Sequence, residues 1–210
     1  MLFRSHGTAE EAAAPAQVVR REPFESLTAA EADTLDAIVA RLIPTDALGP
    51  GAAEARAVRY IDRALGGALS AVRQDYAAGL AALDRYSRSS RGGVFAQLSP
   101  ADQDSILGEL ETGAASGFES SPAEFFNMVL THTHQGTFGD PYYGGNANFV
   151  GWDLIGYPGV RTIVTAEDQR IGIALTPNHK SAYDYPMFVK ATAMNDDRRG
   201  AGGHDHGDPT

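Results

Sequence analysis

Apolar residues recur at helical spacing through the first two thirds of the chain. The first set is Leu35, Ile38, Val39 and Leu42. These positions follow the order i, i+3, i+4 and i+7, so they share one face of an amphipathic helix. The preceding Thr28-Ala-Ala-Glu31 has the form of a capping box, in which both side chains bond to free backbone N–H groups. A helix is therefore predicted between Thr28 and Pro44, because the residue before a proline disfavours helical backbone.

The same spacing predicts four more helices. The second covers about residues 53–65 and the third about residues 69–87, with a Gly-Gly break between them. The fourth begins at Ser99 and the fifth at Ser121, and each serine precedes a proline in the first turn, where its missing N–H costs nothing. The fifth helix runs towards Gly136. We therefore predict a mainly α fold, a small bundle of about five helices.

Residues 136–159, which we call the aromatic segment, depart from this pattern. They are rich in Gly, Pro and Asn, which predicts a long ordered loop and excludes a regular helix or a central strand. They also carry large rings, including the only tryptophan of the chain, and such rings cost free energy when left in water. The rings are expected either to close the end of the bundle or to contact another molecule.

Tyrosine and tryptophan are enriched in protein interfaces, so the aromatic segment and the adjoining helix end are the predicted partner interface. The residues assigned to it are His132, His134, Phe138, Asp140, Pro141, Tyr142, Tyr143, Asn146, Trp152, Tyr157 and Pro158.

The rest of the chain lacks strong periodicity. Residues 1–22 are predicted to form a flexible N-terminal arm and residues 195–210 a disordered tail. The helical domain is placed at residues 23–160. Residues 161–194 contain short apolar stretches that are hard to bury in a small bundle. They are expected to form an extended segment that lies along a partner or along a second copy of the chain.

The composition of the chain argues against several classes of function. The net charge of −10 argues against nucleic acid and anionic lipid, because both require clustered Lys and Arg. The absence of cysteine excludes disulfides, thiolate metal sites and thiol catalysis. No apolar run approaches the length of a membrane span. Arg20-Arg21 is not followed by an apolar run, so this pair is not expected to act as an export signal by itself.

Candidate chemistry centres on two histidines. His132 and His134, with Asp140 and Asp153, are the residues that a free-standing metalloenzyme would use. On a helix, however, positions i and i+2 point about 200° apart, so the two rings share an ion only if the helix has already ended. The alternative is that one ring is buried and the other caps the helix C-terminus. His204-Asp-His206 is a weak chelator expected to be solvent-exposed.

No motif for a catalytic serine, a dinucleotide or a nucleotide phosphate is present in the sequence. We therefore predict no catalytic, cofactor-binding or metal-binding residues in this chain. Two alternatives stay open beside a partner-binding role: the His/Asp metalloenzyme, and a sugar-binding protein whose Tyr and Trp rings stack on the ligand.

Longer motifs bear on this choice. The array His134-x-Gly136, Gly139-Asp-Pro-x-Tyr-Gly-Gly-Asn146, Gly151-Trp152 and Gly156-Tyr-Pro-Gly159 resembles the pattern of the gluconate 2-dehydrogenase subunit 3 family. The first predicted helix, which runs into Ile43-Pro-Thr-Asp46, resembles the N-terminal pattern of the same family. The resemblance spans about residues 24–160.

The resemblance implies an accessory subunit that is not catalytic alone. In such complexes a large flavoprotein of the glucose–methanol–choline type holds FAD and oxidises a sugar or polyol, and a cytochrome c is a further partner. The small subunit supports folding, stability or export of the large one. Many members carry a twin-arginine signal, and this chain departs from that pattern. The expected location is the periplasm, reached with a signal-bearing partner, or the cytoplasm.

Overall fold

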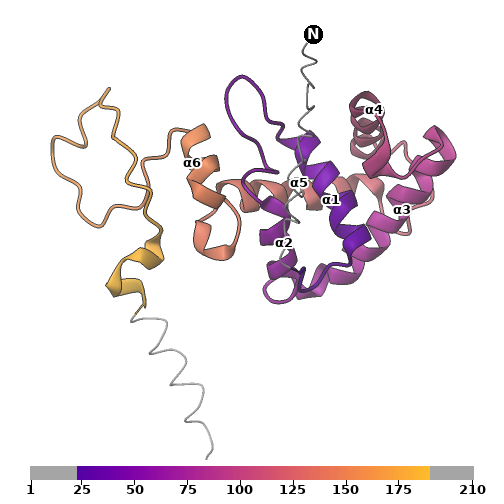
Figure 1. The fold of residues 1–210 in the computed structure, drawn as a ribbon, viewed down its shortest axis with the longest axis horizontal. Coiled ribbons are helices and arrows are strands. Elements are labelled where there is room, and N and C mark those ends of the chain that lie inside the picture. Colours follow the sequence, from indigo (N-terminus) through magenta and orange to yellow (C-terminus); the bar gives the residue numbers. More distant parts are fainter. Residues whose placement is uncertain (1–22, 190–210) are drawn as a thin grey trace, which may run out of the picture.

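The computed structural model describes residues 23–189 (Figure 1), and these residues form a mainly helical structure without β-strands. The α-helices among them are α1 (Ala29–Leu42), α2 (Ala57–Leu65), α3 (Arg73–Arg91), α4 (Pro100–Glu111), α5 (Pro122–Phe138) and α6 (Val150–Leu154). Short 3-10 helices are η1 (Ser70–Val72), η2 (Phe95–Gln97), η3 (Pro141–Tyr143), η4 (Ala147–Phe149) and η5 (Ala182–Asp184). Residues 186–189 are helical as well. The expectations for residues 1–22, for residues 195–210 and for the last part of the extended segment, residues 190–194, lie outside the described residues.

Three predicted helix starts are confirmed. The Thr28 side chain accepts a hydrogen bond from the Glu31 N–H, and Glu31 reaches back to the Thr28 N–H, which completes the capping box. The Ser99 and Ser121 side chains cap α4 and α5 by accepting from the Asp102 and Glu124 N–H groups, and each serine is followed by proline. Helix α2 starts later than predicted, at Ala57, because Arg56 adopts a left-handed backbone conformation with φ of 56°.

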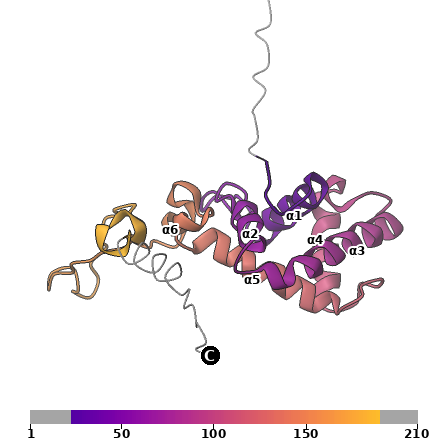
Figure 2. The same ribbon diagram turned by 90° about the horizontal axis from the view of Figure 1, so that it is seen from below.

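The apolar faces of α1 to α5 meet in one core. Helix α5 packs against α1, α2, α3 and α4, and these five helices form the helical body (Figures 1 and 2). The largest fully buried apolar side chains are Tyr76, Phe95, Leu35, Ile38, Ile61, Leu83, Ile106, Leu110, Val39 and Val129. Gly136 permits a close contact between α5 and α2, since a Cβ there would lie 2.9 Å from the Ala57 carbonyl oxygen. The body therefore has its own hydrophobic core without the C-terminal residues.

The N-terminal end of the described chain is held by one buried carboxylate. Asp62 on α2 is fully buried and accepts hydrogen bonds from three successive backbone N–H groups. Its Oδ2 accepts from Glu25 at 2.8 Å, and its Oδ1 accepts from Ser26 at 2.8 Å and Leu27 at 2.9 Å. The carboxylate thus satisfies backbone donors that lead into α1, and it joins the entry of α1 to α2.

The prediction of an unbroken loop from residue 136 to 159 was wrong at two places. Helix α5 continues through Gly136 to Phe138, and residues 150–154 form α6. The continuation of α5 brings Thr137 into the core, where its hydroxyl donates to the Thr133 carbonyl oxygen at 2.8 Å. Some glycines of this segment lie within helices, where the missing side chain lets another part of the backbone come close. Others form turns.

The C-terminal stretch matches the predicted extended character. Its residues 160–189, which we call the arm, contain only η5 and the helical residues 186–189. Both views place the arm at one end of the molecule, beyond α6, with the body helices towards the other end (Figures 1 and 2). The arm touches the rest of the chain through the aromatic segment.

Candidate functional site

Asn146 organises the aromatic segment from inside. It is fully buried, with a left-handed backbone at φ of 43°. Its N–H donates to the Gly136 carbonyl oxygen at 2.7 Å, and its side-chain Nδ2 donates to the Gly139 carbonyl oxygen at 2.9 Å. Its Oδ1 accepts from the Gly151 N–H at 2.8 Å. This side chain therefore ties α6 to the end of α5, and as a buried group it shapes the candidate surface from beneath.

Trp152 is placed in the same supporting role. It is buried, and its Nε1–H donates to the Phe138 carbonyl oxygen at 2.9 Å. Its ring meets Tyr157 edge to face, with centroids 4.8 Å apart, and contacts Phe149 at 5.4 Å. The aromatic rings were expected either to close the end of the bundle or to contact another molecule. Trp152 closes the end of the bundle, and Tyr157 covers the Trp152 ring from the exposed side.

Asp140 fastens the arm to the aromatic segment. Its Oδ1 accepts from the Tyr142 N–H at 2.9 Å and from the Ser181 hydroxyl at 2.6 Å. Its Oδ2 accepts from the Ala182 N–H at 2.9 Å. Ser181 is itself buried. One carboxylate thus joins two segments that lie about forty residues apart, and this junction was not predicted from the sequence.

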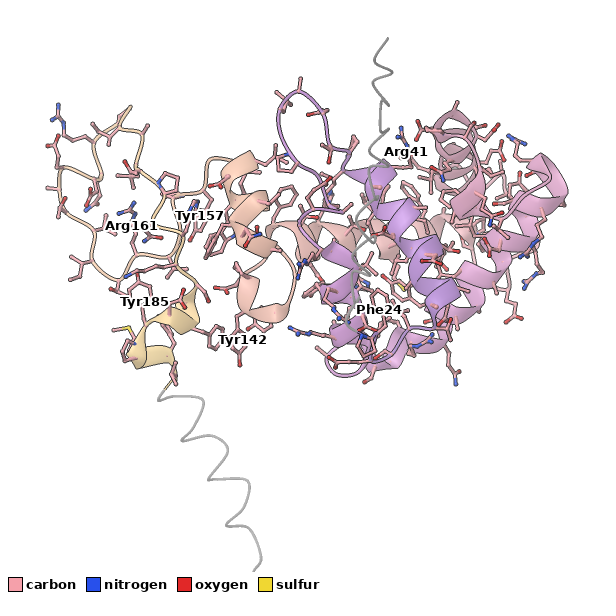
Figure 3. The ribbon with its side chains drawn as sticks, viewed as in Figure 1. Phe24, Arg41, Tyr142, Tyr157, Arg161 and Tyr185 are labelled. Carbon is pink, nitrogen blue, oxygen red and sulfur yellow. The ribbon has the colours of Figure 1, made fainter. Side chains whose placement is uncertain are left out.

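Three tyrosines form an exposed cluster at that junction. The rings of Tyr142 and Tyr183 stack with centroids 3.6 Å apart, and the Tyr143 and Tyr183 hydroxyls are 3.0 Å apart. Tyr142 and Tyr143 remain 54% and 51% exposed. Figure 3 shows Tyr142 between the helical body and the arm. Pro141 begins η3 directly before the pair.

A depression of about 590 Å³ lies beside the tyrosine cluster. It is lined by Pro141, Tyr142, Phe149, Ser181, Tyr183, Asp184 and Val189. The aromatic segment and the arm each contribute part of this lining, so the depression exists only while the two are joined. It offers apolar ring surface with a few polar groups at its edge.

His179 makes a second junction between the arm and the body. Its ring stacks on Phe149, with centroids 5.1 Å apart and planes 14° apart. Its Nε2 lies 2.7 Å from the Asp153 Oδ1 on α6, and both side chains are about half exposed. In the sequence, Asp153 belongs to the metalloenzyme alternative, and no pattern gives His179 a role. The pair instead holds the arm against α6.

The arm has a framework of hydrogen bonds but little core. The Val160 N–H donates to the Lys180 carbonyl oxygen at 3.1 Å, the Asn178 N–H donates to the Pro158 carbonyl oxygen at 3.0 Å, and the Tyr185 hydroxyl donates to the Val160 carbonyl oxygen at 2.8 Å. These bonds close residues 160–180 into a loop (Figure 3). The large apolar side chains that the arm leaves exposed are Ile163, Val164, Ile171, Ile173, Met187, Phe188 and Val189.

The two histidines of α5 point into different surroundings. His132 is buried, and its Nδ1 lies 2.9 Å from the Tyr76 hydroxyl. His134 is exposed beside Phe138, with ring centroids 6.2 Å apart. Because α5 continues unbroken to Phe138, the rings cannot converge on one ion. Between residues 23 and 189, no three His, Asp or Glu side chains are grouped to hold a metal ion.

The expectation that one of these histidines caps the helix C-terminus was wrong. Helix α5 ends at Phe138, and no basic residue lies in its last turn. The expectation of one buried histidine describes His132. Burial raises the pKa of the Tyr76 hydroxyl, so this group keeps its proton beside the His132 ring.

Burial also lowers the pKa of His132, which predicts a pH dependence of stability. The unfolded chain takes up a proton near pH 6.5, whereas the folded chain does so only at a lower pH. The contribution of neutral, buried His132 to the free energy of unfolding should therefore be fully present above about pH 6.5. It should fall as the pH drops below this value, by at most about 1.4 kcal/mol per pH unit. Urea unfolding between pH 5 and 8 measures this slope.

His134 supplies the control for that measurement. His134→Gln should keep the slope, since this ring is exposed in the folded chain. His132→Gln should reduce it. Equal slopes in the two variants would show that another group causes the pH dependence.

None of the helices between residues 23 and 189 combines the length and apolar composition needed to cross a bilayer.

The described residues form a helical body with an aromatic surface and an arm fastened to it. The sequence profile described as gluconate 2-dehydrogenase subunit 3 matches residues 29–159. This match covers more than half of the chain, and the chain belongs to that family. No curated protein and no solved structure matches it significantly.

Family membership confirms the resemblance found in the sequence. The family is that of a small, flavin-free subunit of a dehydrogenase, and it implies a dehydrogenase complex as partner. The match includes the aromatic segment and stops before the arm. The contacts of Asp140 and His179 therefore join family residues to a stretch outside the match.

Proposed function

We propose that this chain is the accessory subunit of an FAD-dependent dehydrogenase that oxidises a sugar, glycoside or sugar acid. It forms a heterodimer with the large flavoprotein of the glucose–methanol–choline type and supports the folding, stability or export of that subunit. FAD and the catalytic residues belong to the large subunit, and a cytochrome c is a further partner. The complex is placed in the periplasm by co-export with a signal-bearing partner, or in the cytoplasm.

The observation that carries this proposal is the exposed apolar surface at the junction of the aromatic segment and the arm. Single apolar side chains on a surface are ordinary, whereas a contiguous group indicates a contact site. Here Tyr142 and Tyr143 adjoin the depression that the arm completes. Tyrosines held by stacking lose little side-chain freedom on binding, which suits them to an interface.

The arm supports the same proposal on energetic grounds. Ordering a residue costs about 1–2 kcal/mol of backbone entropy, and burial of apolar surface is the main compensation. Within residues 160–189, Ser181 is the only buried residue, and several large apolar side chains are exposed. An arm of this composition gains most by burying those side chains against a partner surface.

The direct test is expression of the large flavoprotein of this organism's dehydrogenase with and without the present chain. We expect the chain to co-purify with the flavoprotein and to raise its soluble yield and its FAD content, measured by flavin absorbance. If the flavoprotein is equally soluble, FAD-loaded and active without this chain, the proposed accessory role is wrong.

A point variant probes the role of Asp140. Asp140→Ala removes the acceptor for the Ser181 hydroxyl and the Ala182 N–H, so the arm should be held less firmly against the aromatic segment, with the contacts of His179 and Tyr183 remaining. A loss of about 1–3 kcal/mol in anchoring corresponds to roughly 5- to 150-fold weaker binding of the flavoprotein. Biolayer interferometry with the purified large subunit measures this change.

Glu111→Ala is the matched control for Asp140→Ala, because Glu111 is an exposed carboxylate at the far end of α4. It should bind the flavoprotein as the unaltered chain does. Helical circular dichroism of Asp140→Ala should stay unchanged, since the core residues lie in the body. If Asp140→Ala binds the flavoprotein with unchanged affinity, the fastening of the arm by Asp140 does not contribute to partner binding.

Sugar binding by the isolated chain is the second candidate, favoured by the aromatic lining of the depression. Tyr142 and Tyr183 already stack on each other, so this pair offers a sugar only its outer faces. Isothermal titration calorimetry of the isolated chain with glucose and gluconate distinguishes the candidates. The accessory role predicts no heat of binding, and a saturable isotherm would favour a sugar site.

A further inference from the structure

The loop of the arm contains a short stretch that has the character of a β-strand. Residues 173–176, which we call the edge segment, have the sequence Ile-Ala-Leu-Thr, in which a large apolar residue alternates with a smaller one. They belong to a longer stretch, residues 173–180, without helix, turn or bend. Such alternation along an extended chain is typical of a strand. Figures 1 and 2 place this loop at the end of the molecule away from α1 to α5.

The backbone of the edge segment is not paired within the described part of the chain. The Ile173 N–H donates to the Arg170 carbonyl oxygen at 3.2 Å and completes the preceding turn. The next three N–H groups, of Ala174, Leu175 and Thr176, donate to no other residue between 23 and 189. Successive unpaired N–H groups along an extended stretch form the kind of edge to which another strand adds.

Both ends of the edge segment are fixed. Before it, Gly172 has a left-handed backbone with φ of 85°, which turns the chain and suits glycine. After it, Pro177 restricts Thr176 to extended backbone. The Asn178 N–H then donates to the Pro158 carbonyl oxygen at 3.0 Å. A stretch held extended in this way loses little conformational freedom when it pairs with another strand.

The edge segment lacks the residues that guard an exposed edge. Proteins usually protect free edges with charged side chains, with proline or with a covering element. Residues 171–176 contain no charged residue and no proline, and Ile171 and Ile173 are 105% and 44% exposed. The opposite limb of the loop bends at Thr162 and enters a turn after Thr165, so it offers no straight stretch of this kind. An unguarded edge indicates a segment that is covered in the assembled protein.

The energetics of sheets indicate what covers it. A pair of strands alone is marginally stable in water, and three or more strands with an apolar face are needed. Residues 23–189 contain no strand, so the described part of a second copy could offer only its own edge segment and form a two-stranded ribbon. A sheet that already exists in another protein satisfies the free N–H groups and buries the apolar side chains together. The edge segment also leads directly into His179 and Ser181, which fasten the arm to the surface assigned to the partner.

We propose that residues 173–176 add as an edge strand to a β-sheet of the large flavoprotein subunit. This inference rests on the proposed function and specifies how the arm binds. Backbone N–H and carbonyl groups of the edge segment pair with the open edge of that sheet, and Ile173 and Leu175, which lie on one face of a strand, pack against the partner. The tyrosine cluster is a separate contact.

Hydrogen–deuterium exchange of the full chain tests the pairing directly. In the free chain the N–H groups of residues 174–176 should exchange as fast as those of an unstructured peptide, because no described residue accepts from them. Saturation with the purified large subunit should slow exchange in this segment about 100-fold. Neighbouring N–H groups of a strand point to opposite sides, so the protected group is either that of Leu175 or those of Ala174 and Thr176.

A double variant removes the donors whichever side faces the sheet. Ala174→Pro combined with Leu175→Pro should weaken binding of the large subunit at least about 10-fold, because a sheet acceptor loses its donor. Ala174→Val combined with Leu175→Val keeps both N–H groups and favours a strand, so it should bind like the parent. Both double variants should keep the unfolding temperature of the parent, since the core lies in the helical body.

Ala166→Pro is the matched control for proline, as it lies at an exposed turn position of the same loop and should bind normally. If the unaltered chain binds no flavoprotein, the proposed function fails. If it binds while exchange at residues 174–176 stays fast and the proline variant binds equally well, the proposed function stands and the edge pairing is wrong. Protection of the same N–H groups without flavoprotein, together with a dimer in light scattering, would assign the edge segment to a second copy and overturn the proposal.

Discussion

Replacing Gly151 by alanine is expected to lower the free energy of unfolding by about 3 kcal/mol, at the upper end of the usual cost of overpacking. A Cβ at this position would lie 1.8 Å from the Thr137 carbonyl oxygen. That oxygen belongs to the backbone of α5 and cannot move aside as a flexible side chain could. The strain also displaces the Gly151 N–H from the Asn146 Oδ1. Urea unfolding measures the loss of stability.

Trp152 reports the local effect of this substitution, because it is the only tryptophan and adjoins Gly151. Its fluorescence should shift to longer wavelength as α6 separates from α5 and the ring meets water. Gly108→Ala is the matched control: no atom lies within 4 Å of its Cβ position, and alanine in a helix interior stabilises by about 0.5–1 kcal/mol relative to glycine. Parental stability and emission in Gly151→Ala would contradict the close contact.

Asp62→Ala should destabilise the chain by about 3 kcal/mol, because buried N–H groups left without an acceptor cost about 1–3 kcal/mol each. The three donors belong to Glu25, Ser26 and Leu27, and water can reach the first two in part. Loss of this carboxylate should free the segment that leads into α1. Chemical unfolding followed by circular dichroism measures the change.

Two further variants show whether burial causes the effect of Asp62→Ala. Asp104→Ala removes an exposed carboxylate that pairs with Arg41 at 2.6 Å, and such surface pairs contribute about 0–1 kcal/mol. Asp62→Asn keeps the shape and one acceptor, so its loss of stability should lie between the two. An Asp62→Ala variant as stable as Asp104→Ala would show that the backbone donors have other partners.

The helical body was largely predictable from sequence, and the surface was not. Capping serines and apolar spacing act within a few residues, so the starts of α4 and α5 and their buried faces followed from local pattern. The fate of the aromatic segment depended on what lies beside each glycine. Gly136 and Gly151 allow close contact with other backbone, and a short-range rule treats both as breakers.

The candidate interface shows the same division. Tyr142 and Tyr143 are exposed as an interface requires, and His134 is exposed on α5, whereas Asn146, His132 and Trp152 are buried and support that surface from within. His179 was missed. A histidine in an irregular stretch gives no signal that would distinguish a ring stacked on a neighbour from a ring in solvent.

By itself, the amino-acid sequence determined the helices, their caps, the family and the absence of thiol chemistry, because these depend on neighbouring residues, on motif order and on composition. Only the tertiary structure decided which polar groups are buried and which apolar groups are exposed. The bonds from Asp140 to the arm and from Asp62 to the entry of α1 join residues more than thirty positions apart. Such pairs form only after the chain has folded, and no local pattern specifies them.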